Sequence, residues 1–266
     1  MRIDAVPIWI IFAVTIVLIM VAIEAGYRVG RARHRRSEKE KEAPASAIAG
    51  AVLGLAAFML AFTFDIVMER QAAKRELVRE EAIAIRTGWQ RSDFLPETDR
   101  AEATALLRQY IDVRVTFAGA GSIEPEQVKR LQSETQRIQD RLWNMAVANA
   151  RKDMNSDVAA LYIDSLNEVT GIHILRVALG IQARLPTVNW LVLYGITMLG
   201  MASLGYQTGI ADSKRLLASP MLAVSFALVF TLVASLDRPD SGIRDVPQQP
   251  LIDLRDSIAA AEGRAE

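Results

Sequence analysis

The segment that decides the fold is ASAIAGAVLGLAAFMLAFTFDIVM, residues 45–68, in which Asp65 is the single charged residue. At about 1.5 Å of rise per residue, a helix of this length spans the roughly 30 Å hydrocarbon core of a bilayer. Neither glycine nor proline occurs between Leu55 and Thr87. The segment therefore predicts a transmembrane helix that continues into water as one rod, with Gly88 as its first weak point.

Three further apolar runs predict three more membrane spans, at residues 5–26, 186–206 and 217–236. Trp9 lies near one end of the first run and Tyr27 just beyond the other, where interface anchors are common. A cleavable signal peptide is the competing interpretation of this run, but a single basic residue precedes it. The four runs could instead be buried core helices of a soluble protein. Soluble proteins rarely carry four such runs, so membrane spans are the preferred interpretation.

The long segment between the span pairs predicts a soluble helical bundle. Its apolar residues recur at three and four positions, Pro96 and Pro125 open new helices, and Gly119 ends one. We expect an all-α membrane protein with an inserted antiparallel bundle. Its parts are a transmembrane hairpin (5–68, with a basic loop at 27–44), the bundle (69–185), a second hairpin (186–236) and an amphipathic tail (237–266). The tail lies either on the membrane or on the bundle.

Composition argues against several classes of chemistry. The formal net charge is zero, so no overall field favours nucleic acid. The chain has no cysteine and two histidines, which excludes disulfides and thiolate metal sites and makes a histidine-built metal centre improbable. Catalytic motifs are absent from the sequence. We therefore predict a protein that is not an enzyme and holds no cofactor or metal.

Three polar sites have simple structural interpretations. The stretch from Asp153 to Asp157 resembles the start of a calcium loop, but Val158 stands where that loop needs glycine. A helix cap at Ser156 or Asp157 is the preferred interpretation. His173 lacks an acidic or histidine partner nearby in sequence and is assigned a structural role. The pair Glu80-Glu81 is assigned to a solvated helix face.

Charge in the short loops predicts the topology. Seven basic residues lie in the first short loop and two in the second. The positive-inside rule places both loops in the cytoplasm and hence the bundle and both termini in the periplasm of a bacterial inner membrane. The loop arginines serve either as a topology signal that contacts lipid headgroups or as a site for an acidic partner; the residues concerned are Arg31, Arg33, Arg35 and Arg36.

The second span carries the most informative face. This face combines small residues with two aromatic residues and an acid. Its residues are Gly50, Gly54, Ala57, Phe58, Ala61, Phe62 and Asp65. Small residues let helix backbones approach, which predicts packing between subunits. A buried acid and an aromatic constriction are also typical of a pore-lining helix. Both interpretations stay open at this point.

Four stretches together carry a family resemblance: GLAAFMLAFTF (54–64), REEAIAIRT (79–87), FLP (94–96), and SLDRP with SG and IR (235–244). The last includes a membrane-border motif, Asp237, Arg238 and Pro239. The chain resembles the bacterial bestrophin-like membrane proteins over most of its length. Kinship with bestrophins implies four spans, helical soluble structure between the second and third, and a second span that lines the pore. Phe58, Phe62 and Phe64 are then the counterparts of the aromatic neck.

The resemblance implies an oligomeric ion channel whose partners are the lipid bilayer, ions and further copies of the chain. Bestrophins hold their helical domain in the cytoplasm, whereas the loop charges here place it outside. A membrane-anchored scaffold or sensor that binds a partner through its bundle is the alternative function.

Overall fold

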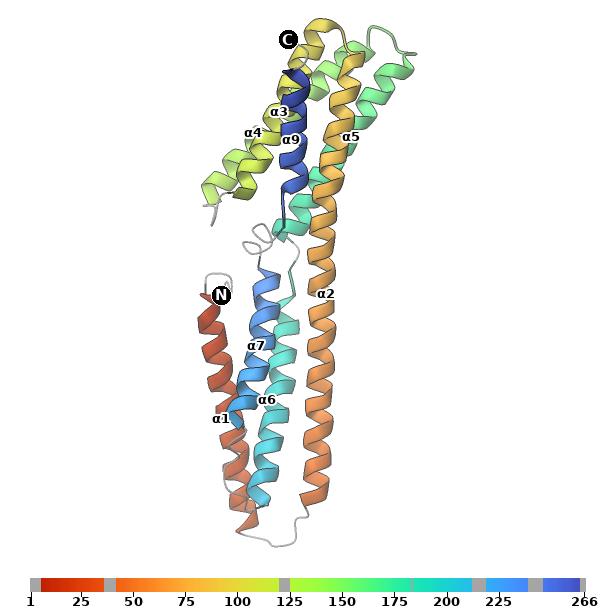
Figure 1. The fold of residues 1–266 in the computed structure, drawn as a ribbon. Coiled ribbons are helices and arrows are strands. Elements are labelled where there is room, and N and C mark those ends of the chain that lie inside the picture. The colour runs from red at the N-terminus through yellow and green to blue at the C-terminus, as the bar shows by residue number, and fades with distance from the viewer. Residues whose placement is uncertain are drawn as a thin grey trace. The chain divides into compact units, whose positions relative to one another are not determined.

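The computed structural model describes residues 6–35, 42–119, 125–182, 184–211, 219–238 and 246–263, and all regular structure in these ranges is helical. In chain order the elements are α1 (Ile8–His34), α2 (Glu42–Arg91), η2 (Ser92–Phe94), α3 (Glu97–Gly119), α4 (Pro125–Ala150), α5 (Asp157–Val177), the π-helical η3 (Ala178–Gln182), α6 (Thr187–Ile210), α7 (Ser219–Asp237) and α9 (Gln249–Glu262) (Figure 1). The predicted all-α class is confirmed.

Four helices of the described chain are long and apolar enough to cross a membrane, namely α1, α2, α6 and α7. Each covers most of one of the four runs predicted from sequence. The chain divides into two compact units, Met1–Glu69 with Arg184–Arg238, and Arg70–Ala183 with Pro239–Glu266. Helix α2 contributes to both units because it is unbroken across Glu69 and Arg70, and it also continues through the buried Gly88 to Arg91.

In the first unit, α1 packs along α6 and α7. The closest approach uses two pairs of glycines four residues apart, Gly26 and Gly30 on α1 and Gly205 and Gly209 on α6. A Cβ at Gly26 would collide with the backbone carbonyl of Ala202, and one at Gly205 with that of Ile23. The absence of side chains is therefore what lets these two helix backbones touch.

The first half of α2 also packs in this unit. Leu60 lies in a cluster with Leu193 of α6 and Phe230 of α7. Farther along, Val67 clusters with Leu185 and Val233. Helix α2 is thereby fixed to α6 and α7 along one face.

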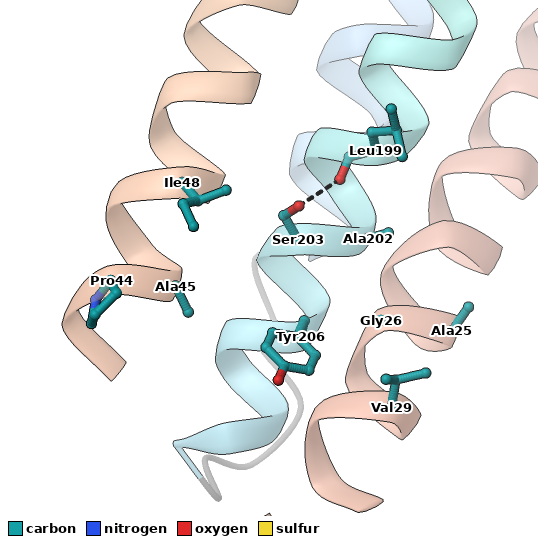
Figure 2. A pocket seen from close by; sticks show the side chains of 10 residues that line it. All are labelled: Ala25, Gly26, Val29, Pro44, Ala45, Ile48, Leu199, Ala202, Ser203 and Tyr206. Carbon is teal, nitrogen blue, oxygen red and sulfur yellow. Dashed lines mark hydrogen bonds between the residues drawn. The ribbon is translucent and has the colours of Figure 1, made fainter. Parts of the chain in front are cut away.

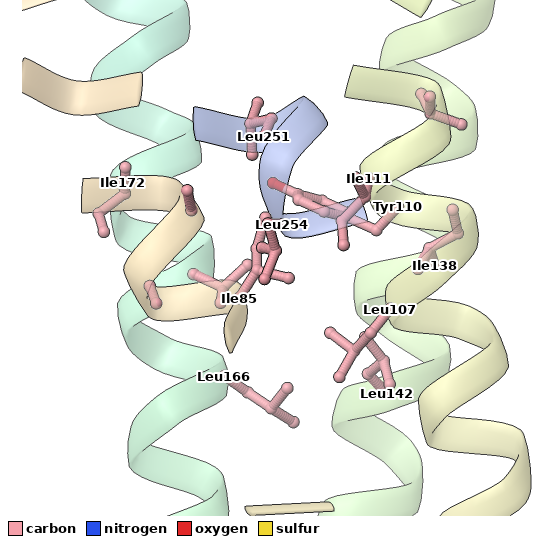
Figure 3. Close-up of a cluster of buried hydrophobic side chains, with 14 of the residues drawn as sticks. Ile85, Leu107, Tyr110, Ile111, Ile138, Leu142, Leu166, Ile172, Leu251 and Leu254 are labelled. Carbon is pink, nitrogen blue, oxygen red and sulfur yellow. The ribbon is translucent and has the colours of Figure 1, made fainter. Parts of the chain in front are cut away.

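Described residues of α2, α3, α4, α5 and α9 build one shared hydrophobic core in the second unit (Figure 3). Ile85 of α2, Leu107 of α3 and Leu251 of α9 are all fully buried in it. The tail therefore lies on the bundle, the second of the two places that its apolar pattern allowed. Burial of Leu251, Leu254 and Ile258 on one side of α9 accounts for this.

Helix ends follow local chemistry. The Ser156 hydroxyl accepts a hydrogen bond from the amide of Ala159 at 3.2 Å, which confirms the predicted N-cap of α5. Val158 lies inside that helix, so the calcium-loop geometry does not form. Helix α3 ends at Gly119 and α4 begins at Pro125, as the sequence predicted.

Candidate functional site

Within the membrane-spanning part of α2, one face is packed. Its buried or partly buried residues recur at intervals of four and three, which keeps them on one side of the helix; they are Ala49, Leu53, Ala56, Leu60, Thr63 and Val67. This side meets α6 and α7 through the clusters described above. Packing of this face against α6 and α7 fixes the orientation of α2 within the unit.

The opposite side is bare. Every residue predicted as a pore or subunit-packing candidate is exposed there: Gly50, Gly54, Ala57, Phe58, Ala61, Phe62 and Asp65. A Cβ built at Gly50 or Gly54 meets no described atom within 4 Å outside its own helix turn. We call these seven residues the uncovered face. The structure thus brings the predicted residues onto one side, although no part of the described chain covers them.

Two aromatic side chains dominate the uncovered face. Phe58 and Phe62 are 58% and 55% exposed, and their ring centroids lie 4.7 Å apart. Phe64 does not join them, because it packs beside the cluster of Val67, Leu185 and Val233. Phe64 therefore lies apart from Phe58 and Phe62 in the described chain, and its place in an aromatic neck stays a prediction.

Asp65 stands two helical turns beyond Phe58, on the same side, and is exposed. A carboxylate in an apolar span is costly unless it meets water or a partner. The described residues give Asp65 no hydrogen bond or ion pair. Its position is therefore suited to a water-filled space or to contact with another chain.

The basic residues after the first span differ in their contacts. Arg28 pairs with Glu24 at 2.8 Å, and the Arg31 guanidinium stands 5.9 Å from the ring centroid of Tyr27. Arg33 is exposed and its side chain contacts no polar group of the described chain. Arg35 is exposed at the end of α1, and Arg36 lies outside the described residues.

The Asp237-Arg238 pair has a structural role in the first unit. A carboxylate oxygen of Asp237 accepts a hydrogen bond of 2.9 Å from the backbone amide of Leu185, which lies just before α6. The Arg238 guanidinium donates to the carbonyl of Val6, just before α1. The pair therefore links the end of α7 to the starts of two other helices. Pro239 lies outside the described residues.

A buried ionic cluster occupies the core of the second unit. Glu81 is completely buried, and one of its carboxylate oxygens accepts a hydrogen bond of 2.8 Å from the hydroxyl of Tyr110. The Nε of Arg114 stands 3.1 Å from the same carboxylate oxygen, and Arg176 donates to the other. The assignment of Glu81 to a solvated face was wrong, because α3 and α5 cover that side of α2 with basic partners.

Two guanidinium groups share this one carboxylate, so the cluster carries a surplus positive charge. Burial lowers the pKa of Arg176 to about 10, which leaves it charged at neutral pH. Its second terminal nitrogen donates to the amide oxygen of Gln248 at 3.1 Å, and Gln248 donates to the carbonyl of Val246 at 2.9 Å. The cluster thus ties the segment before α9 to α5.

His173 borders the cluster. Its ring lies edge-on to Tyr110 at 6.4 Å, and its Nδ1 finds no hydrogen-bond partner among the described residues. Burial, and secondarily the charge of Arg114, lowers the pKa of His173 to about 4. The ring is therefore neutral at physiological pH, as a structural role requires.

The described residues contain no group of three or more histidine, cysteine or acidic side chains that could hold a metal. A family model for the bestrophin-like domain matches residues 11–251. The chain belongs to the bestrophin-like family. It is a multi-pass membrane protein of that family.

Solved structures agree with this membership. The bacterial bestrophin homologue from Klebsiella pneumoniae superposes with a TM-score of 0.59 at 16% identity, covering 94% of this chain and 99% of that one. A point variant of the bestrophin homologue from the same organism gives 0.57 at 17% identity, with the same coverage. At these identities the likeness shows a shared bestrophin fold. Comparison with curated proteins gives no match.

Proposed function

We propose that this bestrophin-like protein forms an oligomeric ion channel in which the uncovered face of α2 surrounds the pore. The observation that carries the proposal is the contrast between the two sides of this helix. One side is packed on α6 and α7, whereas the other presents small residues, two phenylalanines and an acid that the described chain leaves bare.

Small side chains suit this arrangement because several copies of α2 must approach one axis. Gly50 and Gly54 lie one turn apart and offer no side chain to keep neighbours away. A ring of copies would bring the Phe58 and Phe62 side chains together as an apolar constriction, a device by which channels gate through dewetting. The bestrophin fold of the structural neighbours supports this placement.

Asp65 gives the proposed pore its charge. Repeated around an axis, exposed carboxylates form an acidic ring, and such rings favour cations. In planar bilayers, Asp65→Asn should therefore lower the permeability of cations relative to anions, which the reversal potential under a salt gradient measures. The charge-matched control is Glu80→Gln, in the second unit, where the helix side is exposed. An unchanged reversal potential, or silent bilayers with verified protein, contradicts the proposal.

The location is part of the proposal. We place the protein in a bacterial inner membrane, where the loop charges favour short loops in the cytoplasm and the bundle and termini in the periplasm. A reporter that works only in the cytoplasm, fused after Glu266, should be inactive. Activity of that reporter would show that the C-terminus lies in the cytoplasm and would contradict the proposed orientation.

A scaffold or sensor remains the second candidate because the bundle exposes apolar side chains. Met154, in the turn before α5, is 80% exposed, and Val158 and Leu161 are exposed in the first turns of that helix. Such a stripe suits contact with a partner or with a further copy. Particle images decide between the candidates, since the channel requires closed rotational symmetry and the scaffold does not.

A further inference from the structure

We propose that the first unit holds a specific site for an anionic phospholipid, with one acyl chain in a pocket between α1, α2 and α6 and the phosphate on Arg33 (Figure 2). The pocket has a volume of about 800 Å³, within the size range of ligand sites. The site is separate from the uncovered face and does not depend on conduction.

The pocket lies at one end of the membrane-spanning helices, among residues of α1 and α2 that flank the basic loop at 27–44 in sequence. Its walls come from the C-terminal parts of α1 and α6 and from the first turns of α2. The residues that define these walls are Val29 of α1, Ala45 and Ile48 of α2, and Leu199 and Tyr206 of α6. Tyrosine is enriched where membranes meet water, so Tyr206 is suited to a site that also holds a lipid headgroup.

The interior of the pocket suits a hydrocarbon chain. Val29, Ile48 and Leu199 line it and are each more than half exposed, so their apolar surface lacks a partner in the unit. Ser203 also lines the pocket, but its hydroxyl donates a hydrogen bond of 2.8 Å to the carbonyl of Leu199 (Figure 2). No spare donor of that side chain is then left for a polar ligand group.

Arg33 supplies the complementary charge for a phosphate. It follows Val29 by four residues and Gly26 by seven, and both of these line the pocket, so all three share one face of α1. Its exposed side chain contacts no polar group of the described chain. Arg28, by contrast, is paired with Glu24 and lies on another face. A phosphodiester beside the pocket mouth is the ligand group that Arg33 can bind.

The test titrates purified, delipidated full chain in detergent with phosphatidylglycerol, and counts retained lipids by native mass spectrometry. Phosphatidylcholine with the same acyl chains and inorganic phosphate are the comparison ligands. We expect phosphatidylglycerol to be retained in preference to phosphatidylcholine, and inorganic phosphate alone not to be retained. Equal retention of the two lipids, or retention of free phosphate, would overturn the proposal.

Two pairs of variants distinguish binding of the lipid headgroup by Arg33 from binding of the acyl chain in the pocket. Arg33→Gln should weaken phosphatidylglycerol binding about fivefold, while Arg28→Gln, which removes the same charge from the same helix, should not. Ala45→Phe fills the pocket and should abolish retention of both lipids, whereas Ala13→Phe, on an exposed part of α1 outside the pocket, should not. Unchanged retention in both Arg33→Gln and Ala45→Phe overturns the site. So does a change in oligomer size in Ala45→Phe with retention unaltered, because a second copy of the chain would then occupy the pocket.

Discussion

At the scale of single residues, Glu81 is central to the buried ionic cluster, because its one carboxylate faces two buried guanidinium groups. Glu81→Gln keeps the shape and can still accept the Tyr110 hydroxyl, but it leaves Arg114 and Arg176 without a countercharge. Breaking a buried ion pair from one side costs about 3–5 kcal/mol. We therefore expect a clear fall in the thermal denaturation temperature of purified protein.

The neighbouring Glu80 is the matched control. It is exposed, so Glu80→Gln should change the free energy of unfolding by less than about 0.5 kcal/mol. Equal effects of the two substitutions would show that the charge of Glu81 is not needed. The sequence alone did not distinguish the two acids, because their different surroundings arise from arginines 33 and 95 residues away.

His173 predicts a dependence of stability on pH. Burial lowers its pKa in the folded chain to about 4, against 6.5 for the free side chain, so the unfolded chain binds more protons between these values. The contribution of His173 to stability is therefore fully present above about pH 6.5 and is lost as the pH falls toward 4. His173→Gln should flatten the curve of denaturation temperature against pH in this window. A curve as steep as that of the parent protein contradicts the assignment.

At the scale of helices, the contact between α1 and α6 depends on glycine. Gly205→Ala places a methyl group against the backbone of Ile23 and should destabilise the protein by about 1–3 kcal/mol. Gly195→Ala, on the same helix, meets open space and should be neutral or slightly stabilising, since alanine favours helix. Denaturation temperatures in detergent measure both. Similar losses for the two variants would contradict the close-contact account.

Helices were predictable where one local signal suffices. Run length fixed the four spans, and Pro125, Gly119 and Ser156 marked helix ends that the structure confirms. Which glycines touch another helix was not predictable, because Gly26 with Gly30 has the same spacing as Gly50 with Gly54. The first pair meets a facing pair on α6, and such a match between distant segments has no local signature.

At the scale of the whole molecule, membership in the bestrophin-like family follows from residues spread along the chain. The candidate site was predictable in part, because spacing alone placed Phe58, Phe62 and Asp65 on one side of α2. That Phe64 packs beside Leu185 and Val233 was not predictable, because two distant segments supply these residues. The buried cluster around Glu81 depended on three helices and lay beyond a local pattern.

The central claim is that the uncovered face of α2 lines an ion pathway, and the cysteine-free chain permits a direct measurement. Ala61→Cys lies on the uncovered face, and Ala56→Cys, on the same helix, is buried in the packed face. Currents through each variant are recorded in planar bilayers while a charged, water-soluble thiol reagent is added. The account predicts currents that the reagent blocks in Ala61→Cys and leaves unchanged in Ala56→Cys. Absence of current from verified protein, or equal responses of the two variants, would contradict it.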